Sequence, residues 1–384
     1  MTAAMTGRQR LLAAMRREVP DRVPISPRIG SWLSSYYGGS SWLHHVKAAK
    51  EFGFDLCLPV GNVAPAFIFH PQLAYRHVPP EVKIVQQVEE QDGGVTVRRT
   101  FETPAGPLSD VTFLAPGGRE YGISPSPVQH EHLLKEPGDL DKLRYIMPAP
   151  GTETLSEFHE IDQAMGDLGF PEVSMYPPLD HFLGNARGMN QLMMDYYLDR
   201  PFFDRQFAFF HEFALASLKA VLEQGAKAIF GCWYYGSLSA GWSPAIFREV
   251  FVPLMKQYAD LIHRYGGIYH VYDDGKMMRT IGDYVAGGAD VIETLTPPPV
   301  GDVDLAEAKR LYGDKVCLKG YVDLLYVIKM GTVDDVVRAV RYALEVAAPG
   351  GGFILGTSDS IRDGTPLENV RAYFETAHQY GQYS

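Results

Sequence analysis

A repeated strand-then-helix order is the feature that most constrains the fold of this chain. In the C-terminal part, short apolar runs end in loops and are each followed by a helical pattern. Five such runs lie at 226–233, 267–272, 289–295, 315–320 and 352–357. Three further candidates lie in the N-terminal half, at 22–26, 54–60 and 172–177. Eight strands that alternate with helices predict a parallel (β/α)8 TIM barrel.

Helix boundaries along the chain fit the same order. Ser243 and Pro244 supply an N-cap residue and a proline at the first helical position, which predicts a helix start in 243–251. Further helices are predicted from Lys276, over 303–313, as a helical pair at about 322–348, and from Pro366.

One segment departs from this order. Residues 82–114 alternate apolar and polar side chains around Asp92-Gly93-Gly94, which predicts antiparallel hairpins. We expect an excursion over about 65–115 between the second and third barrel strands. The chain is then a single barrel domain over residues 1–384.

Composition and charge exclude several classes of protein. The 35 basic and 46 acidic residues give a net charge of −11, without the basic stripe that a nucleic-acid backbone requires. The three cysteines form no C-x-x-C pair, which is typical of a reducing compartment. No signal-peptide pattern is present, and no apolar run approaches the roughly 18 residues of a membrane span. We therefore expect a cytoplasmic protein that binds neither nucleic acid nor membrane.

The functional residues of a barrel lie on the loops that follow its strands. These loops carry carboxylates, histidines and tyrosines, and they contain no phosphate loop, G-x-S-x-G elbow, H-E-x-x-H motif or dinucleotide fingerprint. The catalytic candidates are His270, Tyr272, Asp274 and Asp359. The substrate-binding candidates are Arg28, Asn62, His181, Trp233, Tyr234, Tyr235, Glu293 and Lys319. Glu293 is included because it ends an apolar run, where an unpaired carboxylate is costly.

Several candidates have a structural alternative. His270 could be a core histidine bonded to the backbone, and Asp273-Asp274-Gly275 could be only a turn and N-cap. Lys319 could form a structural ion pair with Asp323. The aromatic residues at 233–235 could pack beneath a lid instead of contacting a substrate.

Four segments carry a resemblance to a known family. They are RQRLLAAMRREVPDRVP at 8–24, SPAIFREVFVPLMKQYADLIHRYGG at 243–267, GADVIETLTPPPVGDVDLAEAKRLYGDKVCLKGYVD at 288–323, and GGFILGTSDSIRDGTPLENVRAY at 351–373. With these segments the chain resembles the uroporphyrinogen decarboxylase superfamily, whose fold is a (β/α)8 barrel. It is closer to the corrinoid-linked methyltransferases of that superfamily, which demethylate methanol, methylamines, chloromethane or aryl ethers, than to the true porphyrinogen decarboxylases.

The resemblance also identifies departures from the family. Zinc-dependent methyltransferases of this family carry His-x-Cys-Gly after strand five and a cysteine before a terminal Thr-Pro. The corresponding positions here are Tyr272, Asp274 and Asp359, so oxygen donors would hold a harder metal or a more weakly bound zinc. The Arg-rich substrate motif of the porphyrinogen decarboxylases is reduced to Arg28, and their loop aspartate falls at Asn62.

Three functions stay open at this point. The first is methyl transfer from a small methylated compound, such as a methoxylated aromatic, to a thiol or to a corrinoid on a partner protein. A metal Lewis acid, zinc or another divalent ion, would be held at the barrel mouth by some of Asp274, Asp359, His270 and Glu293. The second is a metal-independent decarboxylase or lyase of a small carboxylated or pyrrole-like substrate, with Asp274 or Asp359 as proton donor. The third is a binding protein without catalysis. The resemblance also implies a homodimer.

Overall fold

The computed structural model of the chain describes residues 4–63, 79–91, 93–116, 127–147, 149, 151, 155–233, 236 and 238–383. Its contacts divide the chain into two compact units. The first unit comprises Met1–Gly61, Thr154–Ser174 and Leu222–Ser384, and the second comprises Asn62–Glu153 and Met175–Val221. The expectation of a single domain over residues 1–384 stays a prediction.

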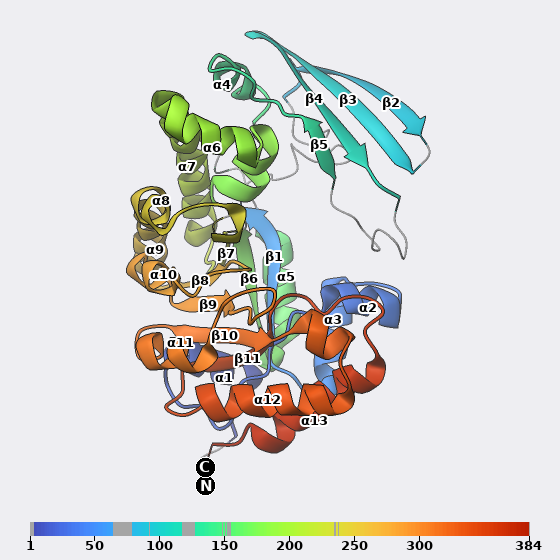
Figure 1. Cartoon of the computed structure of the whole chain (residues 1–384), viewed down its shortest axis with the longest axis vertical. Coiled ribbons are helices and arrows are strands. Elements are labelled where there is room, and N and C mark those ends of the chain that lie inside the picture. Colours follow the sequence, from blue (N-terminus) through green and yellow to red (C-terminus); the bar gives the residue numbers. More distant parts are fainter. Residues whose placement is uncertain are drawn as a thin grey trace. The chain divides into compact units, whose positions relative to one another are not determined.

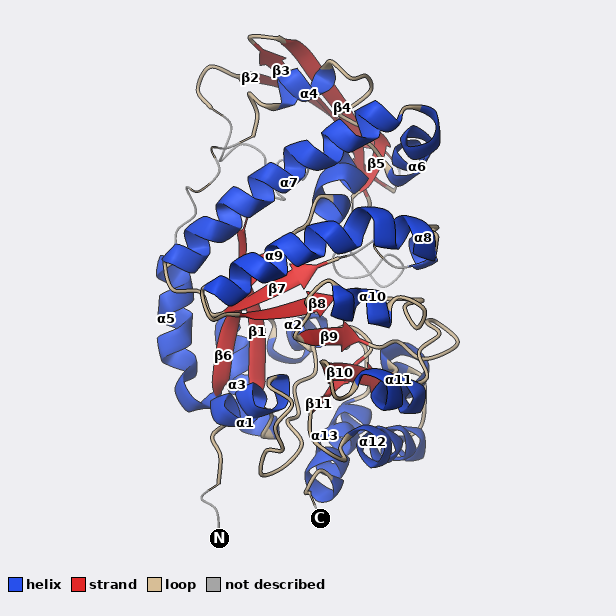
Figure 2. Cartoon of the chain, turned by 90° about the vertical axis from the view of Figure 1, so that its left-hand side faces the viewer, coloured by secondary structure: helices blue, strands red, loops and turns tan. Residues whose placement is uncertain are grey.

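A curled seven-stranded parallel sheet forms the core of the first unit (Figures 1 and 2). Its strands, in sheet order, are β1 (Leu56–Val63), β6 (Gly169–Met175), β7 (Ala228–Cys232), β8 (Ile268–Tyr272), β9 (Val291–Thr294), β10 (Cys317–Val322) and β11 (Phe353–Thr357). The order in the sheet is the order in the chain, as successive strand–helix units produce it. β6, β7 and β11 are buried along their whole length. Seven of the eight predicted strands are thus confirmed.

The eighth predicted strand, at 22–26, is not a strand of this sheet. One parallel bridge joins Ile25 to Leu355 of β11, and Leu355 N donates to Pro24 O at 2.9 Å. On the other side, Asp55 N donates to Ile25 O at 2.8 Å. Pro24 has no N–H to donate, so it interrupts a continuous ladder. The prediction of a closed (β/α)8 barrel is therefore corrected to a TIM-like sheet that is not fully closed.

Three helices of the first unit precede β1, and from β7 onward each parallel strand is followed by at least one helix. The helices and helical turns of this unit are α1 (Gly7–Met15), α2 (Gly30–Tyr37), α3 (Trp42–Phe52), α5 (Ser156–Met165), the 3-10 turns η3 (Gly166–Leu168) and η5 (Leu238–Ala240), α8 (Pro244–Ile246), the π-helical turn η6 (Phe247–Phe251), α9 (Val252–Arg264), α10 (Ile281–Ala286), α11 (Leu305–Tyr312), the π-helical turn η7 (Leu324–Lys329), α12 (Val333–Ala347) and α13 (Leu367–Tyr380). The predicted cap is confirmed, because Ser243 Oγ accepts a hydrogen bond from Ile246 N.

The helix predicted from Lys276 begins five residues later, at Ile281. The intervening residues form a turn in which Asp302 Oδ1 accepts the backbone N–H groups of Met277 and Met278. These two backbone donors lie before the helix and have no intrahelical acceptor, so the Asp302 carboxylate satisfies them instead.

The second unit contains the antiparallel sheet. Its strands are β2 (Lys83–Gln91), β3 (Gly94–Thr103), β4 (Gly106–Leu114) and β5 (Val128–Glu131), paired in that order. The hairpins predicted over 82–114 are confirmed, and β5 adds a fourth strand beyond them. The remaining helices are α4 (Asp139–Leu143), the π-helical turn η4 (Leu179–Gly184), α6 (Met189–Leu198) and α7 (Arg200–Glu223), which runs into the first unit.

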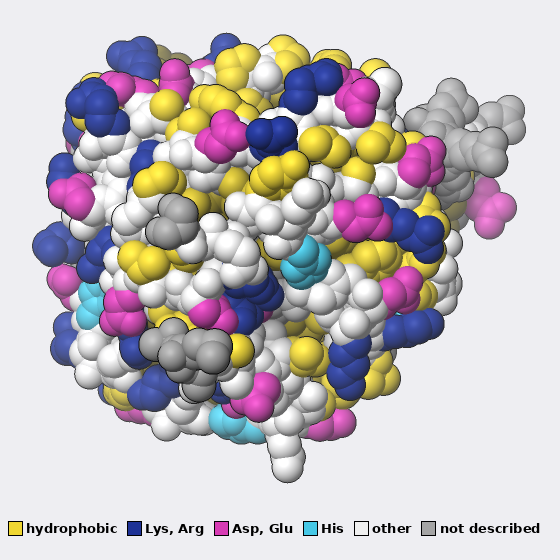
Figure 3. Space-filling view, turned by 90° about the horizontal axis from the view of Figure 1, so that it is seen from below, with side chains coloured by type: hydrophobic (Ala, Val, Ile, Leu, Met, Phe, Trp, Pro, Cys, Tyr) yellow, Lys and Arg dark blue, Asp and Glu magenta, His cyan; other side chains and the backbone are white. Residues whose placement is uncertain are grey.

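The surface carries charges of both signs. On the face drawn in Figure 3, basic and acidic side chains are interspersed among apolar ones. Within the described part of the chain, no helix combines the length and apolarity needed to cross a membrane.

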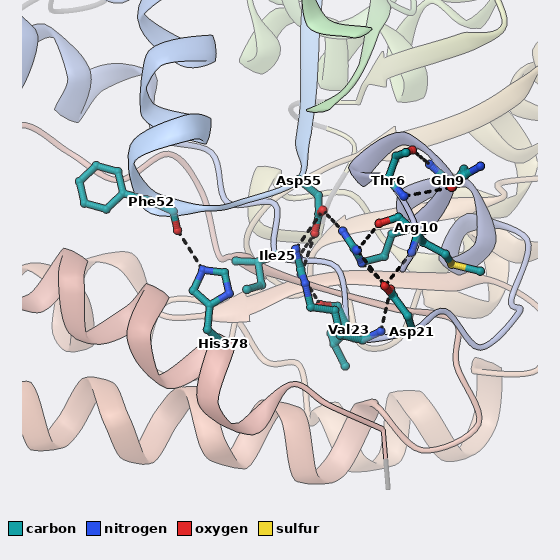
Figure 4. A network of polar contacts seen from close by, with 11 residues as sticks. Thr6, Gln9, Arg10, Asp21, Val23, Ile25, Phe52, Asp55 and His378 are labelled. Carbon is teal, nitrogen blue, oxygen red and sulfur yellow. Dashed lines mark hydrogen bonds and ion pairs between the residues drawn. The ribbon is translucent and has the colours of Figure 1, made fainter. Parts of the chain in front are cut away.

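An ion network holds the N-terminal segment to the start of β1 (Figure 4). Asp55 is only 2% exposed, and its carboxylate accepts from Arg10 at 2.5 Å, from Arg22 at 2.9 Å and from Ile25 N at 3.0 Å. Arg10 also binds Asp21 at 2.6 Å. At the amino ends of barrel strands such residues serve stability rather than catalysis.

We expect Asp55→Asn to lower the free energy of unfolding by about 2 kcal/mol, because hydrogen bonds to charged groups contribute roughly 1.5–3 kcal/mol each. The loss stays moderate because Arg10 keeps its bond to Asp21. Urea denaturation measures the change. The exposed Asp314→Asn variant is the control, expected to stay within about 0.5 kcal/mol of the unmodified chain. Equal effects of the two substitutions would contradict this role of Asp55.

Candidate active site

Charged and polar side chains gather at the carboxyl ends of the strands, and hydrogen bonds join some of them. Tyr272 ends β8, Asp274 follows two residues later, and Asp359 follows β11. The Tyr272 hydroxyl donates to Asp359 Oδ1 at 2.8 Å, and Arg362 forms an ion pair with Asp359 Oδ2. Asp359 does not cap α13, whose N-cap residue is Pro366. We call Arg28, Tyr272, Asp274, Asp359 and Arg362 the mouth cluster.

Arg28 brings a second cation to the mouth cluster. Its guanidinium carbon lies 4.2 Å from the ring centroid of Tyr272 and 5.2 Å from that of Phe230. These distances allow cation–π attraction. The aromatic rings therefore fix a positive charge beside the carboxylates.

Within the mouth cluster, the carboxyl group of Asp274 has a raised pKa. Burial raises the pKa of Asp274 above its ordinary value of 3.8, and the charge of Asp359 raises it further. Arg28 and Arg362 lower the same pKa without cancelling these effects. Asp274 thus keeps its proton to a higher pH than an exposed aspartate, as a general acid requires.

We expect Tyr272→Phe to cost about 1 kcal/mol of stability, because it removes the donor to Asp359 and keeps the ring that contacts Arg28. Urea denaturation measures the loss. Tyr380→Phe is the matched control, because Tyr380 is 43% exposed. A Tyr272→Phe chain as stable as the unmodified one would show that this hydrogen bond contributes nothing.

A buried ion network lies among the strands. We call Glu172 on β6, His270 on β8, Glu293 on β9 and Lys319 on β10 the interior network. His270 Nδ1 lies 2.9 Å from Glu172 Oε1, and His270 Nε2 lies 3.3 Å from Glu293 Oε2. Lys319 Nζ lies 3.1 Å from Glu293 Oε1. All four side chains are at most 2% exposed.

The interior network balances its own charges. Burial opposes ionisation of each group, but Glu172 raises the pKa of His270, and His270 lowers the pKa of Glu172 below its ordinary value. Lys319 and His270 together lower the pKa of Glu293 to about 2 against the effect of burial. Two carboxylates thus face two cations, and the pairs lower the cost of burying charge.

Cys57 on β1 joins the interior network and completes a possible set of metal donors. Within the described residues, donor atoms of Cys57, Glu172 and His270 lie within 4.8 Å of one another. Burial and Glu172, however, raise the pKa of the Cys57 thiol well above its ordinary value. Both nitrogens of His270 face carboxylates, and Lys319 adds a positive charge. A metal ion needs a thiolate and a neutral imidazole, so this group does not fit one as it stands.

The metal set predicted from the sequence is divided between the two groups. His270 and Glu293 belong to the interior network, whereas Asp274 and Asp359 belong to the mouth cluster. Both oxygens of Asp359 already accept from cationic or hydroxyl donors, and Arg28 and Arg362 would repel a cation beside Asp274. The four residues in this arrangement do not fit one zinc ion, and no step of the mechanism depends on a metal.

The other predicted residues have varied surroundings. Trp233 is fully buried, and its Nε1 donates to the Tyr269 hydroxyl at 2.7 Å, which indicates packing. Lys319 pairs with Glu293 rather than Asp323. Tyr234 and Tyr235 lie outside the described residues, as do the side chains of Asn62, at the end of β1, and His181, in η4. Their predicted roles stay predictions.

Sequence reasoning missed Glu172, Cys57 and Arg362. Glu172 lies in β6, where every residue is buried. The signal that singled out Glu293, a carboxylate within an apolar run, applies equally to Glu172 in GFPEVSM at 169–175.

The fold and the mouth cluster define a class of protein: a TIM-like α/β fold with acidic and cationic side chains where its parallel strands end. A family model described as uroporphyrinogen decarboxylase (URO-D) matches residues 183–380, just over half of the chain. The chain belongs to this family.

Curated relatives match over shorter segments. A uroporphyrinogen decarboxylase of Crocosphaera subtropica is 33% identical over 26% of this chain and 29% of the relative. A uroporphyrinogen decarboxylase of Aromatoleum aromaticum is 26% identical over 44% of this chain and 45% of the relative. The chain thus spans less than half the length of these relatives.

A solved structure is similar over almost the whole chain. It is a methyltransferase from Methanosarcina mazei, with a TM-score of 0.65 and 16% sequence identity, covering 98% of this chain and 99% of that chain. At this identity the similarity establishes the fold.

Proposed function

We propose that this chain is an enzyme that transfers a methyl group from a small methylated substrate, with Asp274 as the general acid at the mouth cluster. The raised pKa of Asp274, which burial and the charge of Asp359 cause against the opposing charges of Arg28 and Arg362, is the observation that carries the proposal. The full-length similarity to a methyltransferase supports the choice of methyl transfer.

The chemistry needs a proton at one atom of the substrate. The bond between the methyl carbon and its heteroatom breaks as the carbon bonds to the acceptor. That acceptor is a thiolate, whose thiol has given its proton to water, or a reduced corrinoid on a partner protein. The bonding electron pair stays on the heteroatom, which takes the proton from the Asp274 carboxyl. Arg28 and Arg362 then stabilise the carboxylate that remains. A general acid of this kind contributes about 10²–10⁴-fold to a rate.

Decarboxylation is the second candidate, and the two cations of the mouth cluster favour it. Arg28 and Arg362 could hold a substrate carboxylate. The bond to that carboxylate would break, carbon dioxide would leave, and the carbanion would take the Asp274 proton. The family description agrees with this chemistry. Both candidates thus assign the same role to Asp274.

The two reactions are distinguished by their products. The chain is mixed with methanol, methylamines or methoxylated aromatics and with chemically reduced cobalamin, and methylcobalamin is followed by its absorbance. Parallel samples contain small aromatic or pyrrole carboxylates, and released carbon dioxide is measured. Each assay is repeated with a chelator and with the Asp274→Asn variant.

Methylcobalamin that forms in the presence of chelator and disappears in Asp274→Asn is the expected result. Carbon dioxide release without methyl transfer would select the second candidate. Methyl transfer that the chelator abolishes would contradict the metal-independent mechanism.

A further inference from the structure

A separate pocket is formed by the segments after β9 and β10 together with helix α12. Its volume is about 520 Å³, within the range of small-molecule sites. Its aromatic and proline walls come from Pro297, Pro298, Pro299, Tyr321, Tyr326 and Tyr342. We call it the tyrosine pocket. None of its described lining residues belongs to the mouth cluster or the interior network.

Asp323 supplies a buried carboxylate to the wall of the tyrosine pocket. It is 5% exposed, and its Oδ1 accepts from Leu325 N and Tyr326 N at 2.7 Å each. Its Oδ2 is buried and has no hydrogen-bond partner among the described residues. A buried carboxylate oxygen without its own donor is costly, so the wall beside Asp323 favours a ligand that brings a positive charge close to it.

The tyrosine rings give the pocket an affinity for positive charge. The rings of Tyr321 and Tyr342 lie with their centroids 5.9 Å apart and tilted by 40°. Tyr326 and Tyr342 are 49% and 41% exposed, so part of each side chain is accessible. The negative face of an aromatic ring attracts ammonium groups, most strongly where water is excluded. Large apolar rings beside one carboxylate therefore favour an amine on an apolar body.

The balance of charge around the pocket agrees with a cationic ligand. Arg338 lines the pocket but forms an ion pair with Asp335, which neutralises it. Asp323 then remains without a cation in the described contacts, and the charge of Asp304 acts on Tyr321 as well. The surplus charge is negative, which disfavours an anionic ligand.

We propose that the tyrosine pocket is a second ligand site that binds a protonated amine carried on an aromatic or aliphatic body. The ammonium group lies beside the Asp323 carboxylate in the pocket wall, and the apolar body lies against Tyr321, Tyr326 and Tyr342. The site is distinct from the mouth cluster and does not depend on the reaction proposed there.

Binding of 2-phenylethylammonium, measured by isothermal titration calorimetry, tests the proposal. 2-Phenylethanol has the same body without the charge and is the matched control ligand. We expect the ammonium compound to bind at least about tenfold more tightly than the alcohol, a difference that one partly desolvated cation contact supports. Asp323→Asn keeps an oxygen for the two backbone donors and removes the charge, so it should remove this preference.

Two further variants keep the test decisive. Ala339→Trp places an indole in the pocket from helix α12 and should abolish binding even if Asp323→Asn fails to fold. Asp274→Asn should leave the affinity unchanged, because the mouth cluster is elsewhere. Equal binding of the two compounds, unchanged binding in Ala339→Trp, or a loss of binding in Asp274→Asn would each overturn the proposal.

Discussion

Asp274→Asn is expected to lower turnover by about 10²–10⁴-fold, the contribution of a positioned general acid. Asparagine keeps the shape of the side chain but has no carboxyl proton to give. The same substitution is expected to stabilise the folded chain at neutral pH. The pKa of Asp274 in the folded state is raised above its ordinary value of 3.8. Stability is therefore lost as the pH rises from 3.8 through the folded-state pKa, because the buried carboxyl ionises. Asparagine does not ionise and avoids this loss.

The pH dependence of the rate separates this role from a purely structural one. Activity of the unmodified chain should fall as the pH rises through the pKa of Asp274, because the acid then loses its proton. Asp359→Asn removes a negative neighbour and should move this fall in activity to lower pH. Arg28→Met removes a positive neighbour and should move the fall to higher pH. Asp363→Asn, in the loop after Asp359, is the control that should change neither the rate nor the pH at which activity falls. Full activity of Asp274→Asn would remove the general acid from the mechanism.

Glu172→Gln is expected to lower the free energy of unfolding by about 3–5 kcal/mol near pH 5.5, because removing one member of a buried ion group leaves its partners uncompensated. The variant keeps a hydrogen-bond acceptor for His270 and removes the charge that raises the pKa of His270. Lys319 and a protonated His270 would then face Glu293 alone.

The pH window of this effect follows from the directions of the shifts. The pKa of Glu172 is lowered in the folded state. Its contribution to folding stability is therefore present above the unfolded-state pKa of 4.5 and is lost as the pH falls through the folded-state pKa. The pKa of His270 is raised in the folded state. Its contribution to folding stability is therefore complete below the unfolded-state pKa of 6.5 and is lost as the pH rises through the folded-state pKa. Glu172→Gln should therefore cost most between pH 4.5 and 6.5, and less once the pH has passed the folded-state pKa of His270.

Urea denaturation at pH 5.5 and at a series of higher pH values measures this difference, and NMR of the His270 ring shows where it loses its proton. The exposed Glu375→Gln variant on α13 is the control, expected within about 0.5 kcal/mol of the unmodified chain at every pH. A Glu172→Gln cost that stays constant after His270 has lost its proton would mean that the charge of His270 does not stabilise this carboxylate.

Local sequence patterns were sufficient to predict most of the fold. Apolar runs bounded by Gly or Pro located seven parallel strands, and the alternation around Asp92-Gly93-Gly94 located the antiparallel sheet. The prediction of a barrel strand at 22–26 was wrong, because Pro24 leaves this segment with only one bridge to β11. A fourth antiparallel strand was missed because four residues, 128–131, are too few for a clear alternation.

The site was harder to predict because its contacts join residues far apart in the chain. Strand-end position was enough to select Tyr272, Asp274 and Asp359, which the structure brings into one cluster with Arg28. Sequence could not show that His270 and Glu293 belong to a different, interior group, because that depends on which neighbours enclose them. Glu172 lies 98 residues from His270, so only the folded sheet reveals their ion pair.

The central claim is that the Asp274 carboxyl holds its proton above the ordinary range. The measurement is a pH titration of aspartate side-chain carboxyl shifts by carbon-13 NMR, with the Asp274 resonance assigned by its absence in Asp274→Asn. The account predicts a pKa for Asp274 above 3.8, and one that falls when Asp359 is replaced by asparagine. A pKa at or below 3.8, unaffected by Asp359→Asn, would contradict the assignment of Asp274 as the proton donor.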